Sequence, residues 1–336
     1  MKIGIVGTGK IACEALGVID NMPSVEAVSI FARSHSRAKG EELAHRHGIA
    51  EVYTDYAQML RCTNADFIYI GLVNSAHFAY AAQALQAGHN VIVEKPMCPT
   101  AAEVVQLAAM ARERGLLLVE AVTLLHMPSI AAIAEALPRI GKVHVVSCSY
   151  CQYSSRYDRY LRGDVAPAFD PALNGGALLD LNVYNLNFVV ALFGTPQAHT
   201  YMPVRGHNGI DTSGTMLLRY PGLVASCTAA KDCCGDNFAF IGGERGHIKV
   251  TGPVSELRKV EICVDGHCGL LCKPLEQHRM EAEFEAFSRM LAAHDTAAAE
   301  HFLKISAEVA RLTEATDAST AVHSSMLPGK NPRVQA

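Results

Sequence analysis

The first twelve residues of the chain predict a strand, a tight glycine-rich turn and a helix, in that order. Residues 7–12 (Gly-Thr-Gly-Lys-Ile-Ala) follow the apolar run Ile3–Val6 and fit the pattern G-x-G-x-x-A. In this pattern the first glycine permits the turn, the second lets the backbone approach a pyrophosphate, and the small last residue lets helix and strand pack closely. The start of the helix offers unpaired N–H groups to the phosphates. We therefore expect a dinucleotide to bind at Gly7, Thr8, Gly9, Lys10 and Ile11.

Short apolar runs alternate with helix-like stretches up to about residue 121. This alternation predicts a parallel sheet with helices on both faces, which is the architecture of a Rossmann dinucleotide-binding domain. The expected strands are Ile3–Val6, Val25–Phe31, Glu51–Tyr53, Phe67–Leu72, Val91–Val93 and Leu116–Glu120.

The pattern changes after residue 121, where strand-like segments joined by tight turns predominate. This favours an α+β domain with a large, mainly antiparallel sheet that is open on one face. Its helical stretches are Ala131–Leu137, Ala177–Phe193, Met280–Ala293 and Ala298–Ala318. Since the chain has 336 residues and a domain has roughly 150, we predict two domains, residues 1–121 and 122–336. The second would bind substrate and pair with further copies through its open sheet, giving a homodimer or homotetramer.

Charge and composition exclude several classes of protein. The net charge is −4 and no Lys/Arg cluster occurs, so we expect no nucleic-acid partner. No uninterrupted apolar run approaches roughly 18 residues, so we expect no membrane span. The strand at the very start leaves no room for a signal peptide, which predicts a cytoplasmic protein whose eleven cysteines are reduced thiols rather than metal ligands. Cys263 and Cys268 would face each other across an Asp-Gly hairpin, close enough to form a disulfide if oxidised, although a reducing cytoplasm favours the thiols.

The end of the second strand indicates which dinucleotide binds. An NAD site usually carries an acidic residue there for the ribose 2′-OH. Here the strand is followed by Arg33, Ser34 and Arg37, with no acid. Arginine can pair with a 2′-phosphate and serine can donate to it. We therefore expect NADP(H) to be favoured over NAD(H).

The tripeptide Glu94-Lys95-Pro96 directly follows the apolar run Val91–Val93. A β-branched triplet of this kind predicts a strand buried on both faces. Its carboxyl end lies where open parallel sheets bind ligands. Pro96 ends the strand and restricts the backbone of Lys95. Lys95 is therefore a candidate active-site residue, and Glu94 either pairs with it or steadies the loop.

Two further motifs accompany the glycine loop and this tripeptide. Asn74-Ser75-x-His77 matches a segment usually read as Thr-Pro-Asn-x-x-His, although Leu72-Val73 replaces Thr-Pro. Residues 175–184 (Gly-Gly-Ala-Leu-Leu-Asp-Leu-Asn-Val-Tyr) match G-G-x-L-x-D-x-G-x-[HY], with Asn182 in place of the glycine. Over nearly its whole length the chain therefore resembles the Gfo/Idh/MocA family of oxidoreductases, within it the branch of dimeric dihydrodiol dehydrogenases and NADP-dependent sugar dehydrogenases. Glu120-Ala121 fits that branch, but the Trp and Arg that usually follow are absent.

The resemblance implies an NAD(P)-dependent dehydrogenase or reductase acting on CH–OH groups of a sugar, cyclic polyol or dihydrodiol. It implies that Lys95 lies near the nicotinamide and that Asn74, His77 and Glu94 also belong to the cofactor side. It also places Asp180 and Tyr184 in the substrate domain.

Acid–base chemistry supports the same residues independently. Hydride transfer from an alcohol needs a group that accepts the hydroxyl proton. A tyrosine hydroxyl has a pKa near 10, and a nearby ammonium group lowers that pKa, so Lys95 and Tyr184 form a candidate proton-transfer pair. Asp180 lies four residues before Tyr184 on the same predicted helix and would face the same cleft. Asn187 continues that face, and Arg156 and Tyr157 lie in a polar loop, so all three are candidate substrate contacts.

Two other functions remain open from the sequence. A regulator of the same family could bind the dinucleotide without turnover, although a sensor has no need of proton-transfer groups such as Lys95 and Tyr184. A glycosidase that uses bound NAD in a redox cycle is disfavoured by the missing acid after the second strand and by the tyrosine form of the 175–184 motif.

Overall fold

A six-stranded parallel sheet forms the first domain, in the order β3-β2-β1-β4-β5-β6. The computed structural model describes residues 1–272 and 276–314. The strands are β1 (Lys2–Val6), β2 (Glu26–Phe31), β3 (Glu51–Tyr53), β4 (Phe67–Ile70), β5 (Asn90–Glu94) and β6 (Leu118–Ala121). All five neighbouring pairs are parallel, which confirms the predicted Rossmann fold.

Helices cover both faces of this sheet because the strands carry apolar side chains on both faces. One buried cluster joins the strands to α1 (Lys10–Ile19) and α2 (Arg37–Arg46). The other joins them to α3 (Tyr56–Cys62), α4 (His77–Gln86) and α5 (Ala101–Arg114). The chain reverses its direction of winding between β1 and β4. The segments after β1, β4 and β5 therefore meet at one edge of the sheet, where such folds bind ligands.

The second sheet has eight strands in the order β14-β13-β12-β11-β7-β10-β9-β8. Only one neighbouring pair, β7 and β10, is parallel, which confirms the predicted, mostly antiparallel sheet. The strands are β7 (Val143–Cys151), β8 (Ala198–Arg205), β9 (Asp211–Tyr220), β10 (Leu223–Ala230), β11 (Phe238–Gly243), β12 (Gly246–Thr251), β13 (Lys259–Val264) and β14 (His267–Cys272).

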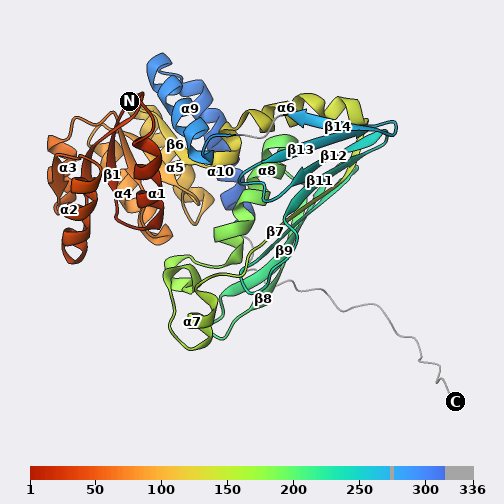
Figure 1. Cartoon of the computed structure of the whole chain (residues 1–336), viewed down its shortest axis with the longest axis horizontal. Helices are drawn as coiled ribbons and strands as arrows, with labels where there is room; N and C mark the ends of the chain where they lie inside the picture. Colours follow the sequence, from red (N-terminus) through yellow and green to blue (C-terminus); the bar gives the residue numbers. More distant parts are fainter. Residues whose placement is uncertain (273–275, 315–336) are drawn as a thin grey trace.

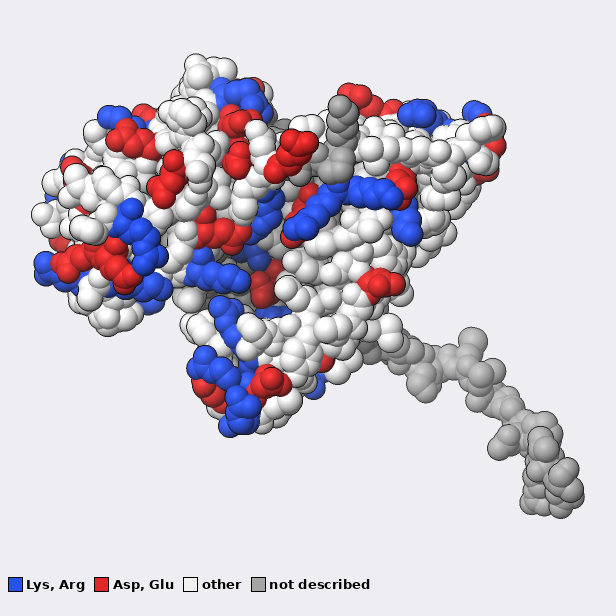
Figure 2. All heavy atoms as spheres, viewed as in Figure 1, with Lys and Arg blue, Asp and Glu red and all other residues white. Residues whose placement is uncertain are grey.

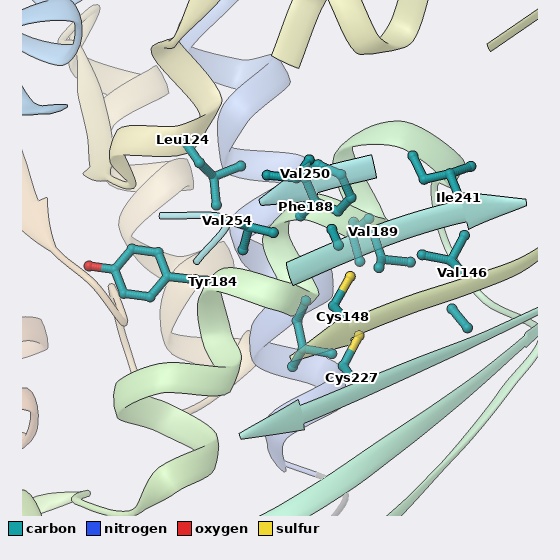
Figure 3. Close-up of a cluster of buried hydrophobic side chains, with 14 of the residues drawn as sticks. Leu124, Val146, Cys148, Tyr184, Phe188, Val189, Cys227, Ile241, Val250 and Val254 are labelled. Carbon is teal, nitrogen blue, oxygen red and sulfur yellow. The ribbon is translucent and has the colours of Figure 1, made fainter. Parts of the chain in front are cut away.

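Helices α6 (Pro128–Ala136), α8 (Val183–Phe193) and α10 (Thr296–Glu314) lie on one side of the second sheet (Figure 1). The short helix α7 (Tyr157–Leu161) belongs to a lobe at its lower end. Figure 3 shows the core beneath α8, where Phe188 and Val189 pack against Val146 and Ile241 of the sheet. Several other apolar side chains on these strands are exposed rather than buried, namely Val145, Met202, Val204, Leu217, Val224 and Leu270.

The last two helices return to the first domain (Figure 1). Helix α9 (Arg279–Ala293) contributes Phe284 and Phe287 to the cluster that contains β1 and β4, and α10 packs on α5. The predicted boundary at residue 121 falls at the end of β6. Because α9 and α10 pack on the first domain, however, the part of the chain after this boundary contacts both domains. The predicted last turn of α10, as far as Ala318, lies outside the described residues.

The predicted hairpin at Asp265-Gly266 is present, and Cys263 pairs with Cys268 across it. We expected free thiols, whereas the structure joins these two residues by a disulfide. Among the described residues no group of His, Cys, Asp and Glu has the arrangement of a metal site. Within the same residues, Pro171–Phe193 is the one segment with the length and apolarity of a membrane-spanning helix, and most of it is buried inside the protein.

Candidate active site

A cleft of about 1130 Å³ lies between the two domains. It exceeds the roughly 300–1,000 Å³ of a pocket for a drug-sized ligand, so it has room for a dinucleotide together with a small substrate. Figure 2 shows Lys and Arg side chains gathered around the hollow between the first domain and the lobe that contains α7. The predicted residues that line it are Gly7, Thr8, Gly9, Lys10, Ile11, Arg33, Asn74, Glu94, Lys95, Arg156, Asp180 and Tyr184.

The glycine loop has the geometry that a pyrophosphate requires. Gly7 has φ +120°, and a Cβ there would collide with the carbonyl oxygen of Gly71. A Cβ on Gly9 would meet little, so the backbone lies open towards the cleft. Gly9 caps α1 without a side-chain hydrogen bond, and the first turn carries no acid. The N–H groups of this turn are thus available to an anion, and the residues present fit a dinucleotide.

The cleft lining near the end of β2 differs in part from the predicted set of residues. Arg33 lines the cleft as predicted, and His35, Ser36 and Lys39 line it too. Ser34 and Arg37 do not belong to the described lining, and Arg37 instead bonds Glu41 at 2.8 Å. A 3-10 turn over Ser34–Ser36 separates β2 from α2. The alternation of strands and helices in the sequence does not predict this turn.

Lys95 is held in place by a buried loop after β5. The Lys95–Pro96 peptide bond is cis. The hydroxyl of Tyr69 donates to Glu94 Oε1 at 2.5 Å, and the backbone N–H of Lys95 donates to Glu94 Oε2 at 3.2 Å. Glu94 therefore steadies the loop rather than pairing with the Lys95 ammonium.

The ammonium group of Lys95 reaches across the cleft to Asp180. Its Nζ donates to the backbone carbonyl of Asp180 at 2.9 Å and to Oδ1 at 3.2 Å. Asp180 lies in a π-helical turn, Leu178–Asn182, that leads into α8. Such turns often occur at functional sites. Burial alone would lower the pKa of Lys95, but Tyr184, Asp180 and Glu94 outweigh it and raise the pKa above its usual range.

Tyr184 lies next to this pair. The Lys95 Nζ is 4.8 Å from the centroid of the Tyr184 ring. In Figure 3 its ring lies at the edge of the apolar cluster and its hydroxyl points away from the other labelled side chains. Lys95 lowers the pKa of Tyr184, as expected, and so does Arg279. Burial outweighs both effects, so the pKa of Tyr184 lies above its usual value of 10.

Glycines in the 175–184 motif make this arrangement possible. Gly176 has φ +103°, and a Cβ there would overlap the carboxyl group of Asp211. That carboxyl accepts the N–H of Leu178 at 2.7 Å and so fixes the start of the π-helical turn. Asn182, which replaces the motif's last glycine, donates to the Cys227 carbonyl of β10 at 2.9 Å and anchors the turn to the sheet.

Comparison with known proteins identifies the family. Residues 1–121 match the oxidoreductase family with an NAD-binding Rossmann fold, and residues 136–249 match the Gfo/Idh/MocA C-terminal domain. The chain belongs to the Gfo/Idh/MocA family of oxidoreductases. It is 30% identical over 315 residues to the scyllo-inositol 2-dehydrogenase (NADP(+)) IolU of Bacillus subtilis, covering 94% of this chain and 95% of that protein.

Two further relatives extend the comparison. The trans-1,2-dihydrobenzene-1,2-diol dehydrogenase of Macaca fuscata fuscata is 33% identical over 260 residues, or 75% of each chain. KijD10, a 3-ketoreductase from Actinomadura kijaniata solved with NADP and TDP-benzene, shares the fold with a TM-score of 0.81 at 23% identity, covering 95% of this chain and 97% of that one. As a member of the Gfo/Idh/MocA family, the chain is an NAD(P)-dependent oxidoreductase of the dehydrogenase/reductase type.

Besides Ser34 and Arg37, three predicted site residues lie outside the described lining of the cleft. Asn187 is fully buried and its amide donates to the Val183 carbonyl at 2.9 Å, so the prediction that it touches substrate is wrong. His77 is also fully buried and its ring bonds the carbonyls of Pro96 and Leu72, which gives it a structural role. The Tyr157 ring packs on Phe169 rather than lining the cleft.

Two basic residues close to Asp180 and Tyr184 were missed from the sequence. Lys231 follows β10 and bonds Asp180, and Arg279 at the start of α9 bonds Glu14 of α1 at 2.6 Å. Lys231 carries the same signal as Lys95, a lysine directly after an apolar strand. Arg279 has no local signal, because it reaches the cleft only through the return of α9 to the first domain.

Three buried acids interact with one another near the loop after β5. Glu94, Glu120 and Glu283 are all buried, and both carboxyl oxygens of Glu283 lack a hydrogen-bond partner among the described residues. Burial raises the pKa of all three. For Asp180, by contrast, Lys95 and Lys231 outweigh burial and hold the pKa well below its usual range. Asp180 is therefore the carboxylate that stays ionised beside Lys95.

Proposed function

We propose that the chain is an NADP(H)-dependent enzyme that interconverts an alcohol and a carbonyl on a sugar, cyclic polyol or dihydrodiol. The observation that carries this proposal is the meeting of Lys95, Asp180 and Tyr184 in one cleft with the glycine loop. The relatives named for scyllo-inositol and dihydrobenzenediol dehydrogenation support the substrate class.

The three side chains supply the proton chemistry of this reaction. The nicotinamide, when bound, supplies or accepts the hydride. In the reducing direction Tyr184, whose pKa is high, donates its hydroxyl proton to the carbonyl oxygen, and the Lys95 ammonium stabilises the negative charge that develops there. In the oxidising direction the same proton returns to Tyr184 from the substrate hydroxyl. Asp180 holds Lys95 charged and in position.

The test is turnover with a panel of aldoses, inositols and trans-dihydrodiols in the presence of NADP+. Absorbance from reduced nicotinamide should rise with at least one compound class. Tight NADPH binding with no turnover across the panel would favour the alternative, a regulator that senses the dinucleotide. Lys95, Asp180 and Tyr184 argue against that alternative, because binding alone does not need them.

The cofactor preference rests on the basic residues at the ribose end of the cleft. Arg33 and Lys39 line this end, whereas the acids of the described lining (Glu14, Glu94, Asp164 and Asp180) belong to other parts of the cleft. Removing one charged contact to a phosphate costs about 1.5–3 kcal/mol, or about 10- to 100-fold in affinity. We therefore expect Arg33→Ala to weaken NADPH binding by about that factor while leaving NADH binding nearly unchanged, as measured by fluorescence titration.

Arg37→Ala tests whether Arg37 adds a second charge at this end, as the sequence predicts. Arg37 pairs with Glu41 outside the described lining, so its loss should change NADPH affinity less than about twofold. A loss for Arg37→Ala as large as that for Arg33→Ala would support the assignment made from the sequence, in which Arg37 adds a second charge. Tighter binding of NADH than of NADPH by the unaltered chain would refute the NADP preference itself.

The second sheet is the proposed contact between copies of the chain. Val224 of β10 pairs with Val145 of β7, and both are more than half exposed. Neighbouring Leu217 is exposed as well, which makes an apolar surface across three adjacent strands. We expect light scattering to show a dimer or tetramer that Val224→Glu dissociates. An unaltered chain that is monomeric at micromolar concentration would contradict this assembly.

A further inference from the structure

Lys231 is a buried lysine with all of its polar contacts inside the protein. Its side chain is only 2% exposed. Its Nζ donates to the Ala168 carbonyl at 2.6 Å and to Asp180 Oδ2 at 2.8 Å, and lies 4.5 Å from the centroid of the Phe169 ring. Its backbone is fixed too, since its N–H donates to the Thr212 carbonyl. Although Lys231 borders the cleft, two of its N–H donors and the side that faces the Phe169 ring are therefore taken up by the protein itself.

Lys231 and Lys95 hold opposite oxygens of the same carboxylate. Lys95 bonds Oδ1 and the backbone carbonyl of Asp180, while Lys231 bonds Oδ2. Lys95 comes from the loop after β5 and Lys231 from the end of β10, so one aspartate links the two domains through two lysines. A carboxylate bonded on both oxygens cannot rotate away from Lys95 without leaving the buried Lys231 ammonium unpaired, which is costly.

The second lysine also changes the charge of the site. A Lys95–Asp180 pair alone sums to zero, whereas the three groups together carry a net charge of +1. A net positive charge beside Tyr184 favours the negative charge that develops on the reacting oxygen. Burying a lysine is unfavourable unless it is paired, so the fold retains Lys231 at a cost in desolvation that its carbonyl, carboxylate and aromatic contacts offset.

We propose that Lys231 is a positioning residue that fixes the Asp180 carboxylate and, through it, the ammonium group of Lys95. The catalytic part of this inference rests on the function proposed above. The competing explanation is purely structural, namely that Lys231 only ties the Ala168–Phe169 loop to the sheet.

The test is a pair of double-mutant cycles with Lys231→Met and Asp180→Asn. Lys231→Met keeps the length of the side chain and removes its charge. In the unaltered background it should lower kcat by about 10- to 100-fold, the loss of one charged hydrogen bond, with NADPH affinity changed less than about twofold. In the Asp180→Asn background the same substitution should change kcat less than about threefold, because its target is already gone. Lys231→Arg should recover most of the activity. Lys304→Met, an exposed lysine on α10, is the matched control.

The second cycle measures the midpoint of chemical denaturation for the same four chains and does not depend on turnover. The double variant should lose no more stability than the more damaging single variant. Additive losses in the denaturation midpoint would refute the link between Lys231 and Asp180 whatever the chain turns over.

An equal loss of kcat in both backgrounds, or a Lys231→Arg variant with as low a kcat as Lys231→Met, would establish the structural explanation instead. A chain that binds NADPH but converts no panel compound would refute the proposed function and leave the denaturation cycle as the deciding measurement.

Discussion

Replacing Lys95 with methionine is expected to lower kcat/KM by about 10³-fold or more while leaving NADPH affinity within about threefold of its original value. Methionine has nearly the length of lysine but no charge, so it removes the bond to Asp180 and the positive charge beside Tyr184. The glycine loop and Arg33, which face the phosphates in our proposal, do not contact Lys95 through any described hydrogen bond. Steady-state kinetics and fluorescence titration of NADPH separate the two effects.

Two further variants sharpen this prediction. Lys95→Arg keeps the charge but not the point-like geometry of an ammonium group, so we expect an activity between those of the methionine variant and the unaltered chain. Lys304→Met on α10 should match the unaltered chain in both measurements. If Lys95→Met kept more than about a tenth of the activity, Lys95 would have no role in proton transfer or charge stabilisation.

The elements that bring Lys95 to the cleft were predictable because each depends on local sequence. An apolar triplet makes β5, Pro96 ends it, and parallel strands align their carboxyl ends. Asp180 and Tyr184 were found through the resemblance of residues 175–184 to the family motif, and their helical spacing placed them on one face, although the helix begins with a π turn that the spacing does not reveal. Asn187 fitted the same spacing and was assigned to the substrate wrongly, because three more residues along α8 lead into the core.

What the sequence could not supply depends on contacts between distant segments. Arg279 reaches the cleft because α9 packs Phe284 and Phe287 against the first domain. The pKa of Tyr184 was expected to fall, since a neighbouring lysine is visible in a motif whereas the depth of burial is not. Lys231 was recognisable in principle, but only once β10 is known to lie parallel to β7, whose end also reaches the cleft.

Tyr184→Phe is expected to lower kcat about 10²- to 10⁴-fold in both directions of the reaction, the usual range for loss of a general acid or base. Phenylalanine keeps the ring beneath Lys95 and its packing at the edge of the apolar cluster, so NADPH affinity and stability should change little. Tyr150→Phe is the matched control. Its ring also lines the cleft, 6.0 Å from that of Tyr184, and its loss should cost less than about tenfold.

The pH dependence of the two directions identifies the group that moves the proton. Burial raises the pKa of Tyr184 above 10 despite the opposing effects of Lys95 and Arg279, so Tyr184 is protonated at neutral pH. The reducing direction uses this protonated form and should be flat between about pH 6 and 9, whereas the oxidising direction needs the phenolate and should rise with pH across the same range. In Tyr184→Phe the rise should disappear. If the residual oxidation kept the same slope, the titrating group would be another side chain, and Tyr184 would serve only to pack beneath Lys95.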